Sequence, residues 1–221
     1  MLILKENIFM ISIHYFTFGP FDENTYILYD ETKECIIIDP GCYDNRERSE
    51  LADFIQQNEL KPVKLLNTHC HLDHIFGNGF VADKYNLKLE MNKNDQIVLD
   101  SYLTVAGIYN LQAQPSPAPS VYLEEGDIVN FGNSSLQIVF TPGHSPGSIT
   151  FYNTEQKFMI AGDVLFNGSI GRSDLPGGNH NALINSIKTK LLALGDDYKV
   201  YSGHGPTTNI GHERKTNPFL T

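Results

Sequence analysis

The sequence predicts a layered α/β fold in which helices cover the outer faces of two packed sheets. Strand-like segments occur in two runs along the chain, and each run is followed by a helical segment. The 221 residues include 41% hydrophobic and 19% charged side chains, an ordinary globular composition for one sizeable core. We therefore expect a single domain over residues 11–221. Residues 1–10 form a possible N-terminal extension, because Met10 offers a second start.

The first run contains three predicted strands bounded by turn residues, at 11–18, 25–29 and 34–38. The Asp39-Pro40-Gly41 segment ends the third strand and leads toward a helix. Asp44 is a suitable N-cap for that helix, and Glu47, three residues later, is its capping-box partner. The apolar stripe of the helix contains Leu51, Phe54 and Ile55.

A short strand at residues 63–66 follows and runs directly into Thr68-His69-Cys70-His71. Two segments with helical character come next, at residues 76–86 and at about 93–110. Three prolines within residues 112–120 then require a loop. The second of the two helices has an apolar set made of Ile97, Val98, Tyr102 and Val105.

The second run contains five predicted strands, then a helix at 181–194 and a last strand at 198–202. Every residue with suggestive chemistry comes directly after a strand, where loops on a rigid scaffold commonly hold functional sites. The five strands are expected at 121–123, 128–131, 136–140, 148–152 and 157–161. The helix carries one apolar face, which contains Leu183, Ile184, Ile187, Leu191 and Leu192.

The strongest functional signal is the segment His69-Cys70-His71-Leu72-Asp73-His74. Side chains two residues apart in an extended chain point the same way, so His69 and His71 can converge on one cation while Cys70 faces away. Asp73 and His74 follow where the chain turns, and they can address a second point nearby. Such a crowded set is costly to bury without a partner, because its imidazoles repel each other when protonated.

Three later residues match this segment in type and in context. His144 lies in a turn-rich loop after the 136–140 strand, Asp163 follows the 157–161 strand, and His204 follows the 198–202 strand. Glycines adjoin all three, and glycine lets the backbone approach bound ions closely.

With these residues in place, the chain resembles the metallo-β-lactamase superfamily, and within it the small glyoxalase II-like branch that includes hydroxyacylglutathione hydrolases. The resemblance rests on HxHxDH followed by H, D and H at strand ends, and it covers about residues 11–214. It implies a four-layer αββα sandwich and two divalent metal ions, with zinc expected first and iron or manganese as alternatives. One metal would be bound by His69, His71 and His144 and the other by Asp73, His74 and His204, with Asp163 bridging them.

The resemblance also implies roles around the metals. Asp39 would accept a hydrogen bond from a ligand imidazole and fix its tautomer. Asp73 would bind metal and also orient the metal-bound hydroxide that attacks a carbonyl. Arg172, in the glycine-rich segment 168–178, would either bind a substrate carboxylate or brace its own loop.

The expected reaction is hydrolysis of a small-molecule thioester of the hydroxyacylglutathione type. True β-lactamases of the superfamily lack an aspartate at the position of Asp163, which disfavours antibiotic hydrolysis. Classical glyoxalase II grips glutathione with a lysine, a tyrosine and a C-terminal helical domain. Here the corresponding stretch reads Arg172-Ser173-Asp174 and the chain stops soon after Phe219, so the thiol half of the substrate stays open.

Three alternatives remain. A persulfide dioxygenase of the same superfamily would use a single iron held by two histidines and an aspartate. A non-catalytic metal-binding accessory module ranks last among the functional readings. The third alternative is a structural zinc site. Such sites commonly use four ligands, with cysteine prominent, whereas this set has seven ligands that are all histidine or aspartate.

The composition limits partners and compartment. The net charge of −10, without a Lys/Arg-rich run, disfavours nucleic acid, including the RNA-processing branch of the superfamily. No stretch approaches the ~18 apolar residues of a membrane span, and the N-terminus lacks signal-peptide features. Three cysteines without CxxC spacing indicate a reducing, cytoplasmic location. The sequence does not indicate an oligomeric state. Structural roles are expected for Cys70, His14, His180 and His212.

Overall fold

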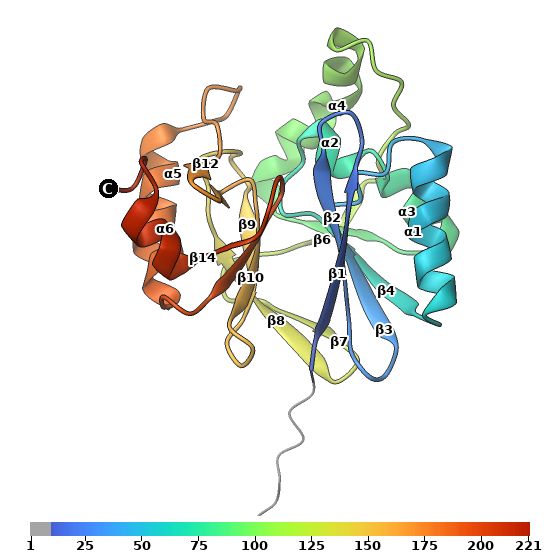
Figure 1. Ribbon diagram of the computed structural model, residues 1–221. Helices are drawn as coiled ribbons and strands as arrows, with labels where there is room; N and C mark the ends of the chain where they lie inside the picture. Colours follow the sequence, from blue (N-terminus) through green and yellow to red (C-terminus); the bar gives the residue numbers. More distant parts are fainter. Residues whose placement is uncertain (1–9) are drawn as a thin grey trace, which may run out of the picture.

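The computed structural model describes residues 10–221, which form four layers (Figure 1). Two six-stranded sheets pack face to face, helices α1 and α3 cover one outer face, and helices α5 and α6 cover the other. The predicted αββα sandwich is therefore confirmed. The predicted extension at 1–10 lies outside the described residues except for Met10.

The first sheet has the strand order β1-β2-β3-β4-β5-β6. Its first three strands are antiparallel neighbours, whereas β3, β4, β5 and β6 run parallel to one another. The strands are β1 (Ser12–Phe18), β2 (Glu23–Tyr29), β3 (Glu34–Ile38), β4 (Lys61–Leu66), β5 (Leu89–Met91) and β6 (Pro119–Tyr122).

The second sheet has the order β14-β13-β10-β9-β8-β7, in which only β10 and β13 pair in parallel. A separate hairpin, β11 (Leu165–Phe166) and β12 (Ser169–Ile170), follows β10. The sheet strands are β7 (Ile128–Phe131), β8 (Ser134–Phe140), β9 (Ile149–Asn153), β10 (Phe158–Gly162), β13 (Lys199–Ser202) and β14 (Thr208–Asn209).

Helices connect the strands and close the outer layers. Helix α4 lies across one end of the sandwich, above the sheets in Figure 1. The helices are α1 (Asn45–Gln57), α2 (Leu72–Ile75), α3 (Asn78–Tyr85), η1 (Lys93–Asp95), α4 (Gln96–Ile108), α5 (His180–Ser186), η2 (Ile187–Leu191), η3 (Leu192–Leu194) and α6 (Ile210–Thr216).

Strand alternation divides the interior into three apolar layers. In β3, Ile36 and Ile38 face the second sheet, whereas Ile37 between them faces the outer helices. This period of two is the property that lets one strand contribute to two core layers. The third layer packs α5 and its continuation against the outer face of the second sheet, with Leu183, Ile187 and Leu191 fully buried.

Several sequence expectations need correction. The helix predicted at 181–194 is broken into an α-helical, a π-helical and a 3₁₀ segment. The predicted loop at 112–120 ends early, because β6 begins at Pro119. Glu47 does not complete a capping box: its carboxylate accepts from the N–H groups of Tyr43 and Gly19 instead. The elements that were missed, namely α2, β5, β11, β12, β14 and α6, are too short to show clear periodicity.

The apolar stripe predicted for α4 was also wrong in part. Tyr102 is buried, but Ile97 is 71% exposed, and the core-facing residues include Leu99 and Ala106. The three cysteines are buried and free. Their odd number and spacing predicted that they form no disulfide framework. None of the helices in residues 10–221 is long and apolar enough to cross a membrane.

Candidate metal centre and pocket

The structure brings all seven predicted ligand residues together at one end of the sandwich. Each follows a strand: the loop after β4 and the short helix α2 supply four of them, and three later loops supply the others. The residues are His69 and His71 in the β4–α2 loop, Asp73 and His74 in α2, His144 between β8 and β9, Asp163 after β10, and His204 after β13.

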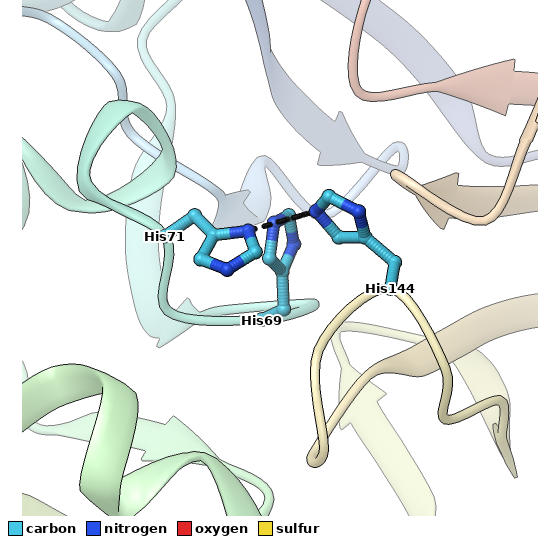
Figure 2. A group of neighbouring side chains, drawn as sticks. All are labelled: His69, His71 and His144. Atoms are coloured by element: carbon cyan, nitrogen blue, oxygen red, sulfur yellow. Dashed lines mark hydrogen bonds between the residues drawn. The ribbon is translucent and has the colours of Figure 1, made fainter. Parts of the chain in front are cut away.

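Three imidazoles form a first cluster (Figure 2). His144 Nε2 lies 2.8 Å from His71 Nδ1 and 3.2 Å from His69 Nε2. The backbone carbonyl of Arg172 accepts a hydrogen bond from His144 Nδ1 at 2.7 Å, so the Nε2 atom of neutral His144 carries a lone pair. Thr68 Oγ1 lies 3.1 Å from His69 Nδ1 and donates its own proton to Asp39, which leaves the lone pair of His69 on Nε2. Nε2 of His69 and Nε2 of His144 thus face the interior of the cluster, where the ligand nitrogens of the three histidines lie within 4.8 Å of one another.

A second cluster contains Asp73, His74 and His204. Asp73 Oδ2 lies 3.1 Å from His204 Nε2 and 4.0 Å from His74 Nε2. The carbonyls of Phe21 and Asp22 accept from His204 Nδ1 at 3.0 and 3.1 Å, which turns Nε2 of His204 toward the cluster.

Asp163 lies between the two clusters and contacts both. Its Oδ1 is 3.3 Å from His74 Nε2, and its Oδ2 is 3.4 Å from His144 Nε2 and 3.5 Å from His204 Nε2. Among the described residues, the buried His74 Nε2 and Asp163 Oδ1 atoms have no hydrogen-bond partner. Buried polar atoms are rarely left unpaired, so these atoms fit a site that holds cations.

The two clusters differ in electrostatics. Burial, helped by neighbouring imidazoles, lowers the pKa of His69 well below its usual range and that of His71 to about 3. Burial also acts to lower the pKa of His74, but the carboxylates of Asp163 and Asp73 outweigh it and raise that pKa well above its ordinary value. His69 and His71 are therefore neutral, whereas the second cluster is an ion-paired network.

Asp39 contacts both Thr68, which precedes His69, and His74. Its carboxylate accepts from Thr68 N at 2.7 Å and Thr68 Oγ1 at 2.5 Å, and its Oδ2 lies 3.0 Å from His74 Nδ1. The hydrogen bond at Nδ1 directs Nε2 of His74 into the site. Asp39 itself has φ +51°, a left-handed conformation that is uncommon outside glycine and often found at functional sites.

Two buried acids near the site were not predicted. Glu23 lies behind His74, with Oε1 3.7 Å from His74 Nδ1, and burial raises its pKa well above the ordinary value. Asp95 accepts hydrogen bonds from Cys70 N at 2.6 Å and from Ser145 Oγ and Gly147 N at 2.5 Å each. It therefore ties the His69–His71 loop to the loop of His144. A lone acid in sequence carries no signal of such distant partners.

Close approach at the site requires glycine at two positions. A Cβ on Gly203 would overlap Asp163 Oδ1 and come within 2.7 Å of a carbon of the His74 ring. Gly143, beside His144, has φ +135° and packs against the backbone of Leu183 with no room for a Cβ.

A pocket of about 460 Å³ opens directly above the clusters. Its floor contains ligand-type residues from both clusters, and its walls come from α4, from Phe21 and from the loop after β12. Arg172 lines the pocket, but its guanidinium forms two bonds to the Asp174 carboxylate, at 2.7 and 2.8 Å. These contacts fit the bracing role expected for Arg172, and substrate binding by this residue stays a prediction.

Comparison with known proteins agrees with this architecture. The family model described as the metallo-beta-lactamase superfamily matches residues 18–204. The chain belongs to this superfamily. A curated relative, the hydroxyacylglutathione hydrolase GloC of Haemophilus influenzae, is 37% identical over 202 residues, which are 90% of this chain and 93% of that protein.

Two solved structures are also similar over their full lengths. TTHA1623 in a di-iron-bound form is 37% identical, with a TM-score of 0.84 over 94% of this chain. BLEG-1, a B3 metallo-beta-lactamase, is 34% identical, with a TM-score of 0.83 over 95% of this chain. Membership in this superfamily and the His/Asp clusters support a metal-binding hydrolase.

Proposed function

We propose that this protein is a binuclear metal hydrolase that cleaves small-molecule thioesters. The observation that supports it most is Asp163, whose carboxylate contacts both ligand clusters: Oδ1 lies near His74, and Oδ2 lies near His144 and His204. Two ligand sets that share one carboxylate are what a pair of nearby cations requires, and such pairs are typical of hydrolytic sites.

In this proposal His69, His71 and His144 would hold one cation, Asp73, His74 and His204 would hold the other, and Asp163 would be shared between them. A divalent metal pair bound there lowers the pKa of a coordinated water and polarises a carbonyl oxygen. Zinc is the first expectation for these ligands and iron the second, since imidazole and carboxylate suit both. Iron stays an alternative because the similar structure of TTHA1623 is described in a di-iron-bound form.

The residues of the chain orient the reactants. Asp73 lies at the pocket floor, with its side chain 13% exposed, and its carboxylate can accept a hydrogen bond from a water there. That contact would turn a lone pair of the water toward a carbonyl in the pocket. Asp39 keeps the His74 ring in one orientation.

The thioester substrate class comes from the similarity to GloC, which is named a hydroxyacylglutathione hydrolase. The acidic surface, with a net charge of −10, favours a small molecule over nucleic acid as the partner. We propose a cytoplasmic site of action, in keeping with three buried free thiols.

The test is metal analysis of the purified protein together with thioester turnover. We expect about two metal equivalents per chain and hydrolysis of S-lactoylglutathione or of a simpler acyl thioester. Chelation should remove the activity, and zinc or iron(II) should restore it. A fully loaded protein that is inactive on every thioester tested would instead favour a non-catalytic metal-binding module.

A second candidate is β-lactam hydrolysis, which is favoured by the 34% identity to BLEG-1. The sequence expectation disfavours it because of Asp163. Nitrocefin turnover by the metal-loaded protein decides between the two: a kcat/KM above that for every thioester would reverse their order.

The remaining enzymatic alternative is a mono-iron persulfide dioxygenase. It predicts one iron per chain and oxygen uptake that depends on a thiol persulfide. Thioester hydrolysis by a protein with two metals and no oxygen uptake would exclude it.

A further inference from the structure

One side of the pocket is formed by helix α4 and by Tyr109, which directly follows its last residue. We call this surface the α4 wall and define it by Ile97, Val98, Tyr102, Val105 and Tyr109, all of which line the pocket. Only Ser101 adds a polar side chain to the part of α4 that faces the pocket. The opposite face of the helix packs Leu99 and Ala106 into the core. The helix is therefore apolar on two sides.

Tyr102 and Val98 of this wall also contact the core, but two other residues of the wall do not. Ile97 is 71% exposed and Tyr109 is 52% exposed, so their side chains contribute little to folding. Isolated exposed apolar residues are ordinary, but a contiguous set that lines a concave pocket is characteristic of a ligand site. This pocket also ends at the candidate metal centre, where the scissile carbonyl of a substrate would lie.

The other walls of the pocket are apolar as well. Leu175 and Pro176 lie in the loop after β12, and Phe21 lies in the turn between β1 and β2. The rings of Phe21 and Tyr109 meet edge to face, with centroids 5.9 Å apart, although they come from distant parts of the chain. The mouth of the pocket is thus aromatic.

Outside the candidate metal centre, the described lining residues offer no unpaired cation to an anionic substrate group. Arg172 is the one Lys or Arg side chain among the lining residues, and Asp174 neutralises it through a bidentate pair. The remaining acidic and histidine side chains of the lining are Asp73, Asp163, His71, His144 and His204, all of which belong to the candidate metal centre. A glutathione moiety carries two carboxylates, and no unpaired lysine or arginine lines the pocket to receive them.

We propose that the α4 wall binds an apolar acyl group, aliphatic or aryl, and that the protein prefers acyl thioesters of this kind over hydroxyacylglutathione. This inference rests on the proposed function for the position of the carbonyl. The hydrophobic effect supplies the selectivity, because burying each methylene stabilises the complex by about 0.8 kcal/mol, or about fourfold in affinity.

The test separates binding from hydrolysis. Thioethers have no scissile carbonyl, so calorimetric titration of the metal-loaded protein with S-ethyl- and S-hexyl-N-acetylcysteamine measures the pocket alone. We expect the affinity to rise by about fourfold per methylene until the chain fills the wall. S-hexylglutathione should bind no more tightly than S-hexyl-N-acetylcysteamine. The kcat/KM for hexanoyl over acetyl thioesters should rise in parallel.

Two matched variants locate the effect on α4. Ile97→Asn changes the wall, whereas Ile108→Asn changes a residue of the same type on the same helix that is 77% exposed and outside the pocket. Because both side chains are exposed, both variants should fold. We expect Ile97→Asn to weaken S-hexyl binding by about tenfold and Ile108→Asn to leave it unchanged.

Affinity that does not depend on chain length, or glutathione thioethers that bind more tightly than the uncharged ones, would overturn the inference. Equal losses in the two variants would also overturn it, because they would show a surface effect of the whole helix. If thioethers bind as expected but no thioester is cleaved, the proposed function fails while the apolar site stands.

Discussion

The two ligand clusters of the candidate metal centre share Asp163 but differ in chemistry. The cluster of His69, His71 and His144 contains only imidazoles, and burial keeps the first two neutral. The cluster of Asp73, His74 and His204 contains a carboxylate that already pairs with protonated rings. His69 and His71 can accept a cation without giving up a proton, whereas His74 and His204 must exchange protons for metal.

Two unlike ligand clusters thus take ligands from one short segment of the chain. Residues 69 and 71 come from extended chain, where alternate side chains point the same way, and residues 73 and 74 come from the short helix α2. The change from strand to helix geometry within six residues is what directs the ligands to two points.

The largest effect is expected for Asp163→Ala, because this side chain contacts both clusters. Loss of a hydrogen-bond partner behind a metal ligand typically costs 10- to 100-fold, so loss of the bridging residue itself should cost more than ~100-fold in turnover. Metal analysis should show both equivalents reduced. A variant that keeps two metals and normal turnover would refute the bridging role.

His71→Ala should separate the clusters. Its Nδ1 belongs to the first cluster, so we expect loss of about one metal equivalent, retention of the other, and turnover reduced by more than ~100-fold. The comparison with Asp163→Ala in the same metal assay is the control. Equal losses of both metals in the two variants would mean that the clusters do not load independently.

Loading of the second cluster should depend on pH. In the metal-free protein the pKa of His74 is raised by Asp163 and Asp73, and hydrogen bonding to Asp73 with the charge of Asp163 raises that of His204. Both rings are protonated below their raised pKa values, so metal binding releases protons and its affinity rises with pH, by up to about tenfold per unit for each proton. The pKa of His71 is about 3 and that of His69 is also lowered, so these two ligands should release no protons on metal binding between about pH 6 and 8. Calorimetry in buffers of different ionisation enthalpy counts the protons released. Equal proton release at both sites would contradict the comparison.

How much of this could be predicted from the sequence depends on how local each signal was. His69, His71, Asp73 and His74 were found because they are close together in the chain, and the two sheets were found because strand periodicity is local. Asp95 and Glu23 were missed because their partners are far away in sequence; Asp95 lies 25 residues from Cys70 and 50 from Ser145. The apolar face of α4 was recognised, but periodicity cannot tell whether the core or a pocket covers Ile97.

Asp95→Asn should disturb the first cluster more than the second. Its carboxylate joins the Cys70 and Gly147 amides, which belong to the two loops that carry His69, His71 and His144. Replacing a charged acceptor with an amide should destabilise the fold by about 1.5–3 kcal/mol. It should also weaken metal binding at the first cluster by about 10-fold. Thermal unfolding and metal titration measure the two effects. Intact affinity at the first cluster, with loss at the second, would be the contrary result.

The smallest effect is expected for Cys70→Ala, although Cys70 lies between two ligands. Its side chain points away from the first cluster into the core, where Sγ lies 3.4 Å from Met91 Sδ, and burial raises the pKa of the thiol well above its usual value. A protonated thiol is a poor metal ligand, so metal content and turnover should stay within about twofold of the unmodified protein. The small cavity should lower stability by about 1 kcal/mol.

Metal analysis beside His71→Ala makes the contrast direct, because the two positions are adjacent and only the alternation of the chain distinguishes them. Loss of metal in Cys70→Ala would show that this alternation does not govern the loop.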